Sequence, residues 1–87
     1  MSAVANLFRP LEPQTLRQTL EAHRRYLAHR TGGRRAVLAY ADLSNFRLDG
    51  VDLSDADLTG ARLAGTSMSG VKLAGAVLFG ADLRDAD

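Results

Sequence analysis

The chain has no cysteine and no tryptophan, and only two prolines occur among its 87 residues. Without cysteine there is no disulfide framework and no thiolate metal site. No run reaches the length of about 18 apolar residues that a membrane-spanning helix needs, and the first nine residues lack the apolar core of a signal sequence. These absences exclude a disulfide-stapled fold and a transmembrane helix, and they favour a bacterial-type cytoplasmic location.

Net charge is also nearly absent, at a formal +1, but the charges are unevenly distributed. Residues 1–35 carry seven arginines against two glutamates, a balance of +5, and residues 36–87 carry four basic residues against eight aspartates, a balance of −4. We expect the basic patch to be a solvated outer helix face. Contact with nucleic acid or an anionic surface is the less favoured alternative, because only Tyr26 is available to stack on a base. The patch comprises Arg17, Arg24, Arg25, Arg30, Arg34 and Arg35.

A large aliphatic side chain returns at every fifth residue in the second part of the chain. An α-helix turns by about 100° per residue, so this spacing would scatter the side chains around its cylinder. A flat strand would send successive ones to opposite faces, because its period is two. The pattern therefore predicts a solenoid that turns one corner per five residues. The inner positions are Leu38, Leu43, Leu48, Leu53, Leu58, Leu63, Met68, Leu73, Leu78 and Leu83.

Glycine recurs two residues after the inner aliphatic position. The third position of a type II turn needs a positive φ, which glycine adopts without steric cost. We therefore expect type II turns at these corners and a different turn type where Tyr40, Asp55 and Asp85 take the same position. The corner glycines are Gly50, Gly60, Gly65, Gly70, Gly75 and Gly80.

The charge pattern sets the circumference of the coil. Stacking residues 20 apart places Arg62 between Asp42 and Asp82. Stacking residues 15 apart instead opposes Asp42 to Asp57, and Arg47 to Arg62. Like charges on adjacent strands destabilise a sheet, so four blocks of five residues per coil are favoured.

Runs such as Ala41-Asp42-Leu43 and Ala81-Asp82-Leu83 resemble the A(D/N)LXX signature of pentapeptide repeat proteins. The resemblance covers ten consecutive blocks and implies a right-handed quadrilateral β-helix, here of about two and a half coils. The predicted fold is an all-β solenoid of this kind, capped by one N-terminal α-helix. Members of the family include topoisomerase inhibitors that resemble B-form DNA in shape and charge and bind gyrase.

Residues 12–30 show helical spacing, with Pro13 at the expected first helical position and Gly32-Gly33 ending the run. A capping box of Thr15 and Gln18 is the alternative start. A helix with one narrow apolar stripe must pack against something, and the open edge of the first coil offers that surface. The expected cap contacts are Leu16, Leu20, His23, Leu27 and Phe46.

The expected organisation is therefore a tail over residues 1–11, a capping helix and basic hinge over residues 12–35, and the β-helix over residues 36–87. The tail either drapes over the coil through Leu7 and Phe8 or is disordered. No catalytic, cofactor or metal site is expected. His23 and His29 lie too far apart on the helix to chelate, and no hydroxyl has a base beside it.

The far end of the coil has no expected cover, although repeat arrays normally need capping units for solubility. We therefore predict a non-enzymatic interaction module that associates through this end, as a tail-to-tail homodimer or by docking onto another protein. A gyrase-binding DNA mimic is the alternative, disfavoured because Arg62, Lys72 and Arg84 interrupt the acidic columns. The expected interface residues are Leu73, Val77, Leu78, Phe79 and Leu83.

Overall fold

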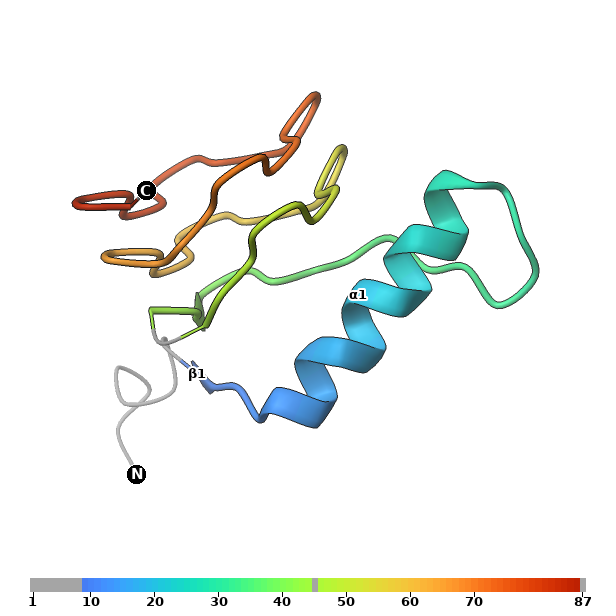
Figure 1. The fold of residues 1–87 in the computed structure, drawn as a ribbon, viewed down its shortest axis with the longest axis horizontal. Helices are drawn as coiled ribbons and strands as arrows, with labels where there is room; N and C mark the ends of the chain where they lie inside the picture. Colours follow the sequence, from blue (N-terminus) through green and yellow to red (C-terminus); the bar gives the residue numbers. More distant parts are fainter. Residues whose placement is uncertain (1–8, 45, 87) are drawn as a thin grey trace.

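The structure is a computed structural model that describes residues 9–44 and 46–86. Three elements follow one another in the chain: strand β1 (Arg9–Pro10), helix α1 (Pro13–Leu27) and strand β2 (Ala41–Asp42). Beyond the helix the chain winds through stacked coils, and α1 crosses the N-terminal end of the stack obliquely (Figure 1). The molecule is thus a coil of short segments with one helix at one end.

Strand β1 adds a parallel rung beneath the first coil. It pairs with β2 in a register that places Pro10 opposite Asp42. The chain that precedes α1 therefore covers part of the N-terminal edge of the stack. The predicted contacts of Leu7 and Phe8 lie outside the described residues.

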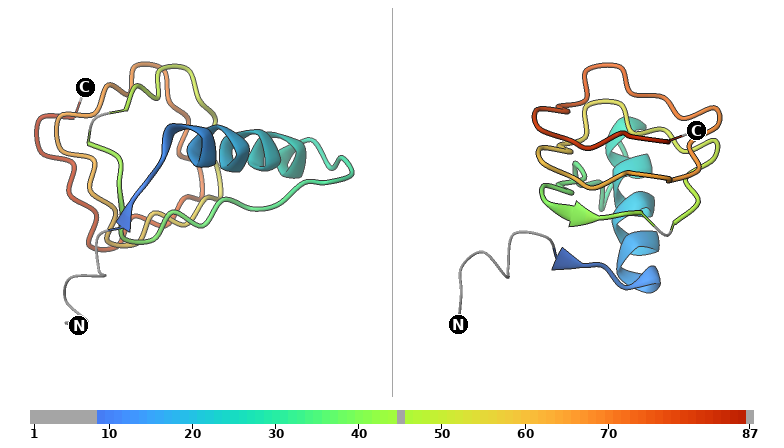
Figure 2. Two further views of the ribbon diagram at one scale, coloured as in Figure 1. Left: turned by 90° about the horizontal axis from the view of Figure 1, so that it is seen from below. Right: turned by 90° about the vertical axis from the view of Figure 1, so that its left-hand side faces the viewer.

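The coils stack at an interval of twenty residues. Viewed from below, they overlie one another, with α1 across their outline (Figure 2). This is the interval predicted from the charge pattern, in which Arg62 lies between Asp42 and Asp82. The parallel bridges join Val37 to Asp57, Asp42 to Arg62, Arg47 to Ser67, Asp52 to Lys72, Asp57 to Val77 and Arg62 to Asp82.

Each corner is closed by a hydrogen bond from the amide three residues after the inner position. The Val51 N–H donates to the Leu48 carbonyl at 3.1 Å, and the Ala61 N–H donates to the Leu58 carbonyl at 3.0 Å. The intervening glycines have positive φ, for example 73° at Gly65. This combination is that of the predicted type II turn.

The prediction of a different turn at Tyr40, Asp55 and Asp85 is wrong. Their φ angles are 60°, 65° and 56°, in the same left-handed region as the glycines. The closing hydrogen bond and the stacking of the inner positions fix the corner geometry, so these side chains accept a backbone conformation that disfavours a Cβ.

Leucines and small side chains fill the interior of the coils. The leucines from Leu38 to Leu63 at the inner positions are at most 2% exposed. Thr66 is also buried among them, and its hydroxyl donates to the Leu43 carbonyl at 2.9 Å. Every buried polar side-chain atom among the described residues has a hydrogen-bond partner, as a close-packed interior requires.

Helix α1 begins where Pro13 predicts, at the first turn. Glu12 is the N-cap residue and makes no side-chain capping bond. The alternative start at a capping box of Thr15 and Gln18 is therefore not used, because the helix is already formed two residues before Thr15.

The C-terminal end of α1 differs from the prediction, since the helix stops three residues earlier. His29 has a φ of 57°, and its N–H donates to the Tyr26 carbonyl at 3.1 Å. The Arg30 N–H donates to the Arg25 carbonyl at 2.8 Å. These two bonds form a Schellman motif, so His29 rather than Gly32-Gly33 terminates the helix.

The two glycines allow the returning chain to pass close to the helix. A Cβ on Gly33 would overlap the backbone nitrogen of Tyr26. One residue later, the Arg34 N–H donates to the Ala22 carbonyl at 2.9 Å. The return segment is thereby fixed to α1 before the first coil begins.

Candidate functional site

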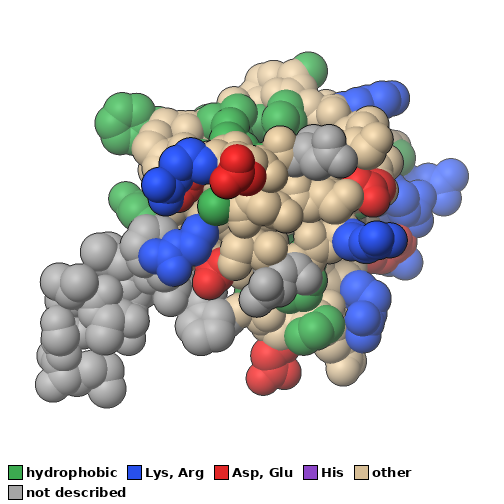
Figure 3. All heavy atoms as spheres, turned by 60° about the vertical axis from the view of Figure 1, so that its left-hand side comes forward, with side chains coloured by type: hydrophobic (Ala, Val, Ile, Leu, Met, Phe, Trp, Pro, Cys, Tyr) green, Lys and Arg blue, Asp and Glu red, His purple; other side chains and the backbone are tan. Residues whose placement is uncertain are grey.

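The last coil, residues 71–86, carries Phe79, the most exposed large apolar side chain of the described structure. Phe79 is 83% exposed, Leu83 41% and Val77 40%, whereas Leu73 and Leu78 are half-buried against the core. Apolar side chains gather along the upper rim of the molecule, where this coil lies (Figure 3). The five residues predicted as an interface are therefore together at one end of the stack.

The same coil has an open hydrogen-bonding edge. In the coil beneath it, the Leu58 N–H donates to the Val77 carbonyl at 2.8 Å, and the Val77 N–H donates to the Ala56 carbonyl at 2.9 Å. The corresponding outward groups of the last coil have no backbone partner among the described residues. They are the N–H groups of Leu73, Gly75, Leu78, Gly80, Leu83 and Asp85 and the carbonyls of Val71, Ala76 and Ala81. An edge of this kind is ready to pair with another chain.

The opposite end of the stack is closed by α1, and His23 is the central contact. Its side chain is fully buried. The Nδ1 atom accepts the Ala36 N–H at 2.9 Å, which places the ring proton on Nε2. The Nε2 atom lies 2.8 Å from the Ser54 carbonyl and donates to it. His23 therefore joins the helix to both the start of the first coil and its last side.

The other predicted cap residues lie on the face of α1 that carries His23, except Phe46, which belongs to the first coil. Leu16 is 4% exposed and belongs to the core, and Leu20 and Phe46 are partly buried against that core. Leu27, at the end of the helix, is half-buried. Sequence spacing therefore found this face, but it did not reveal the two hydrogen bonds of His23, whose partners are distant backbone groups.

Part of the basic patch is neutralised on the helix itself. Arg24 and Arg25 converge on Glu21, with N–O distances of 2.6 Å and 3.2 Å. Hydrogen bonds from Arg24 and then Arg25 lower the pKa of Glu21 to about 2. These side chains are largely exposed, so their contribution to stability is small.

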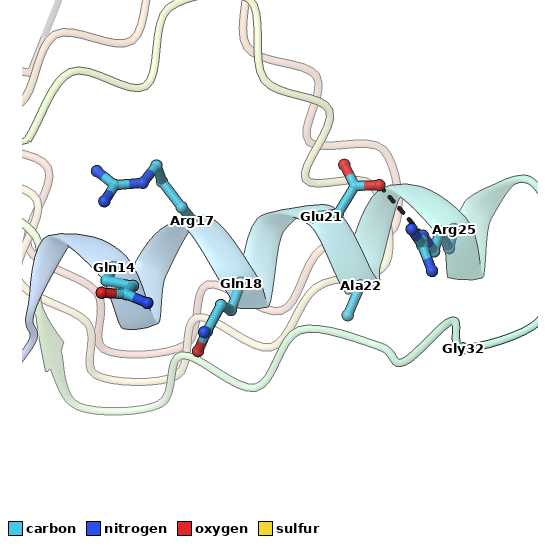
Figure 4. Close-up of a pocket in the computed structure, with 7 residues that line it drawn as sticks. All are labelled: Gln14, Arg17, Gln18, Glu21, Ala22, Arg25 and Gly32. Atoms are coloured by element: carbon cyan, nitrogen blue, oxygen red, sulfur yellow. Dashed lines mark hydrogen bonds and ion pairs between the residues drawn. The ribbon is translucent and has the colours of Figure 1, made fainter.

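The other arginines of the patch form no ion pair within the part of the chain that the structure describes; they are Arg17, Arg30, Arg34 and Arg35. Nε of Arg35 donates to the Asp55 carbonyl at 2.6 Å. Arg17 borders a groove of about 500 Å³ between α1 and the return segment near Gly32 (Figure 4). Gln14, Gln18 and Arg25 also line this groove. The groove is open to solvent, and it holds no buried unpaired side-chain group that would mark a ligand site.

Asp42 and Asp57 each bind both the hydroxyl and the backbone N–H of the residue two positions further on. Oδ1 of Asp42 accepts the Ser44 N–H at 3.1 Å, and Oδ1 of Asp57 accepts the Thr59 N–H at 3.0 Å. Bonds from the Ser44 and Thr59 hydroxyls, then from these amides, hold the pKa of each carboxyl below its usual value. These bonds therefore fix the backbone of the two residues that precede each of these corners.

Ion pairing between coils is correspondingly weak. Arg62 stacks over Asp42 as predicted, but their closest N–O distance is 4.0 Å. Asp82 pairs instead with Arg84 on its own coil at 2.8 Å.

In the described ranges, no three His, Cys, Asp or Glu side chains are placed to hold a metal ion. No helix there is long and apolar enough to cross a membrane.

A chain that turns a corner every fifth residue belongs to the solenoid class of repeat proteins. Residues 56–87 match the family model of pentapeptide repeats, in eight copies. This match confirms the resemblance to pentapeptide repeat proteins that the A(D/N)LXX blocks indicate. No curated protein and no solved structure matches the chain. A match to this family indicates a structural or protein-interaction module.

Proposed function

We propose that the chain is a non-enzymatic interaction module that associates through the end formed by its last coil. In this proposal residues 36–87 form a right-handed quadrilateral β-helix of about two and a half coils. Residues 12–35 form the capping helix and hinge, and residues 1–11 form the tail. The twenty-residue interval of the bridges supports the four-sided coil.

The observation that carries the proposal is that apolar exposure and the open ladder edge occur on the same coil. Phe79, at 83% exposed, and Leu83, at 41%, lie beside N–H and carbonyl groups that have no backbone partner among the described residues. A partner at this end would bury apolar area and complete the ladder in one step. At the opposite end, β1 is already paired with β2 and α1 packs against the first coil through His23.

The oligomeric state tests this proposal. We expect the 87-residue chain to sediment above the mass of one chain, with a mass that stops increasing at two chains as the concentration rises. Phe79→Ser should weaken the association by about tenfold or more, because it removes a large apolar side chain from the interface. Val37→Ser, on the first coil, is the control and should have no effect. A wild-type chain that stays monomeric at all concentrations contradicts the proposal.

A further inference from the structure

We propose that the C-terminal end of α1 and the segment that follows it, residues 24–35, bind single-stranded nucleic acid. In this inference one unpaired base stacks on Tyr26, and the adjoining phosphates contact Arg24, Arg25 and Arg30. The site uses no residue of the last coil, so the inference does not depend on the association proposed above. Residues 24–35 are called the basic lobe below.

The basic lobe projects beyond the coils. Figure 1 and Figure 2 both show the C-terminal end of α1 and the return segment extending past the outline of the stack. The return segment is held in place there, because the Arg34 N–H donates to the Ala22 carbonyl at 2.9 Å. A fixed, projecting segment can bind a partner with little loss of its own conformational freedom.

The charge of the basic lobe has one sign. Between Glu21 and Asp42 the sequence contains five arginines and no acidic residue. The positive charge of this stretch comes from arginine alone, since Lys72 is the one lysine of the chain. The planar guanidinium group binds phosphate through two parallel hydrogen bonds, which an ammonium group does not offer. This composition favours a partner that carries phosphate groups.

The arginines of the lobe meet at one hollow. Glu21 accepts hydrogen bonds from both Arg24 and Arg25, so one carboxylate faces two guanidinium groups and a positive charge remains. Arg30 forms no ion pair in the described ranges of the chain. The hollow has a volume of about 540 Å³ and is lined by Arg24, Arg25, His29, Arg30 and Thr31.

The carbonyl groups at the end of α1, which would repel an anion if they were free, are occupied. The Arg24 carbonyl accepts the Ala28 N–H, and the Arg25 carbonyl accepts the Arg30 N–H. The Tyr26 carbonyl accepts the His29 N–H. Because the negative end of a helix arises from unpaired carbonyls, these bonds reduce its effect on a bound phosphate.

Tyr26 supplies an aromatic surface beside the arginines. Its ring stacks on the His23 ring, with centroids 5.7 Å apart and an angle of 22° between the planes. His23 is fixed by two hydrogen bonds, so the Tyr26 ring is held in position. Tyr26 is nevertheless 39% exposed. An exposed, fixed aromatic ring is the kind of surface on which an unpaired base stacks.

The aromatic surface and the basic hollow adjoin. Tyr26 borders a second hollow of about 350 Å³, and His29 and Arg30 line both hollows. A base on Tyr26 therefore has its own phosphates beside Arg30. Asp55 also lines the second hollow, which favours phosphate contacts on the side of the first hollow. The two hollows together fit one nucleotide unit and the phosphates that flank it.

Two features favour a single strand over a lipid surface or a duplex. A helix that binds a membrane surface needs an exposed apolar face, whereas Leu16 and His23 on the apolar face of α1 are buried against the coil. In a duplex the bases are stacked inside the double helix, so Tyr26 would have no base to contact.

Fluorescence anisotropy with labelled oligonucleotides tests this inference. The probes are an oligouridylate and an oligothymidylate of about ten nucleotides, within the range that one small site covers. We expect saturable binding at low salt and weaker binding of a duplex of the same length. If three phosphates are contacted, the logarithm of the binding constant should fall with the logarithm of the salt concentration with a slope of about −2.

Arg30→Gln tests the phosphate contacts. We expect it to weaken binding by about threefold to tenfold and to reduce the magnitude of the salt slope by about 0.7, because one phosphate contact is lost. Arg47→Gln is the matched control, since it removes the same charge from an exposed position on the first coil. This control should leave both the affinity and the slope nearly unchanged.

Two substitutions of Tyr26 test the stacking. Tyr26→Leu should weaken binding by about tenfold and leave the salt slope unchanged, because it removes a stacking surface and no phosphate contact. Tyr26→Phe keeps the ring and should bind as the wild type does. Circular dichroism checks that each variant is folded.

The outcomes decide the inference independently of association through the last coil. No saturable binding to either oligonucleotide at low salt overturns it, as does Arg30→Gln weakening binding no more than Arg47→Gln. Binding to phosphatidylserine vesicles without binding to either oligonucleotide assigns the lobe to a lipid surface and also overturns it. A monomeric wild-type chain with the expected binding supports this inference and contradicts only the association.

Discussion

At the scale of the residue, the corners show that a fold can impose a backbone conformation on side chains that disfavour it. Tyr40, Asp55 and Asp85 take the same positive φ as the glycines at the other corners. A left-handed conformation costs a residue with a Cβ roughly 1–2 kcal/mol. The closing hydrogen bond and the packing of the inner leucine offset that cost, so glycine is favoured at a corner without being required.

At Gly65 the cost of the left-handed conformation can be measured without a steric clash from neighbouring atoms. Its φ is 73°, and an added Cβ would meet no atom within 4 Å. We expect Gly65→Ala to lower the free energy of unfolding by about 1–2 kcal/mol, from backbone strain alone. Gly65→Asn should cost less, because asparagine tolerates this conformation better. Urea denaturation followed by circular dichroism measures both, and equal effects of the two substitutions would contradict this account.

At the scale of the element, α1 is attached to the coil by more than its apolar stripe. Leu16 supplies burial, but His23 supplies two hydrogen bonds to backbone groups at opposite limits of the first coil. An unpaired buried backbone group costs free energy, so the first coil needs a side chain that satisfies both. The helix is therefore a structural part of the first coil as well as a cover for its edge.

Replacing His23 tests this attachment. Asparagine is too short to reach both the Ala36 N–H and the Ser54 carbonyl, so His23→Asn leaves at least one of them unpaired. We expect a loss of about 2–4 kcal/mol in the free energy of unfolding. His29→Asn is the matched control. It should change stability by less than about 0.5 kcal/mol, because His29 is exposed and asparagine suits its positive φ. A loss no larger than that of the control would show that His23 only fills space.

At the scale of the whole molecule, the two ends of the stack differ in charge and in closure. The +5 balance of residues 1–35 lies with the helix, and the −4 balance lies with the coils. The helix end is covered, while the last coil exposes Phe79 and an open ladder edge. The two ends of the described stack therefore present different surfaces, one covered by the helix and one with exposed apolar side chains.

The carboxylates of the coils make the stability of the whole molecule sensitive to acid. Their hydrogen bonds lower the pKa in the folded state, so the stabilisation is complete above the unfolded value of about 3.9 and is lost as the pH falls below it. For Asp82, bonded mainly by Arg84, the folded pKa is about 2. The carboxyls with lowered pKa are Asp42, Asp49, Asp52, Asp57 and Asp82.

We therefore expect the free energy of unfolding to be nearly constant from neutral pH to about pH 5 and to decrease between about pH 4 and pH 2. Urea denaturation over this range measures it. Asp57→Asn should be less stable at neutral pH and should lose less stability on acidification, because one titrating group has been removed. A wild-type stability that does not change down to about pH 3 would contradict the role given to these bonds.

Most of the fold could be predicted from the sequence, because the same five-residue pattern recurs in ten consecutive blocks. The five-residue spacing of leucine indicated the solenoid, and the alternation of Asp42, Arg62 and Asp82 indicated the twenty-residue interval. The prediction from the sequence was wrong where the conformation of a single residue decides the geometry, as at the end of α1. There His29, rather than Gly32-Gly33, takes the left-handed conformation.

The candidate site divides in the same way. The sequence places Val77 and Phe79 at the far end of the coil, where apolar residues at outward positions depart from the repeat pattern. The unpaired backbone groups of the last coil, and the position of Val77 between Lys72 and Asp82, could be identified only from the folded structure.

The sequence by itself determined the repeat, its inner leucines and the presence of one amphipathic helix, because these depend on periodicity and on local backbone preference. Only the tertiary structure decided which backbone groups His23 binds, which corners accept a side chain at positive φ, and which face of the stack stays open. Those features depend on contacts between residues far apart in the chain, such as His23 with Ser54, and no local pattern encodes them.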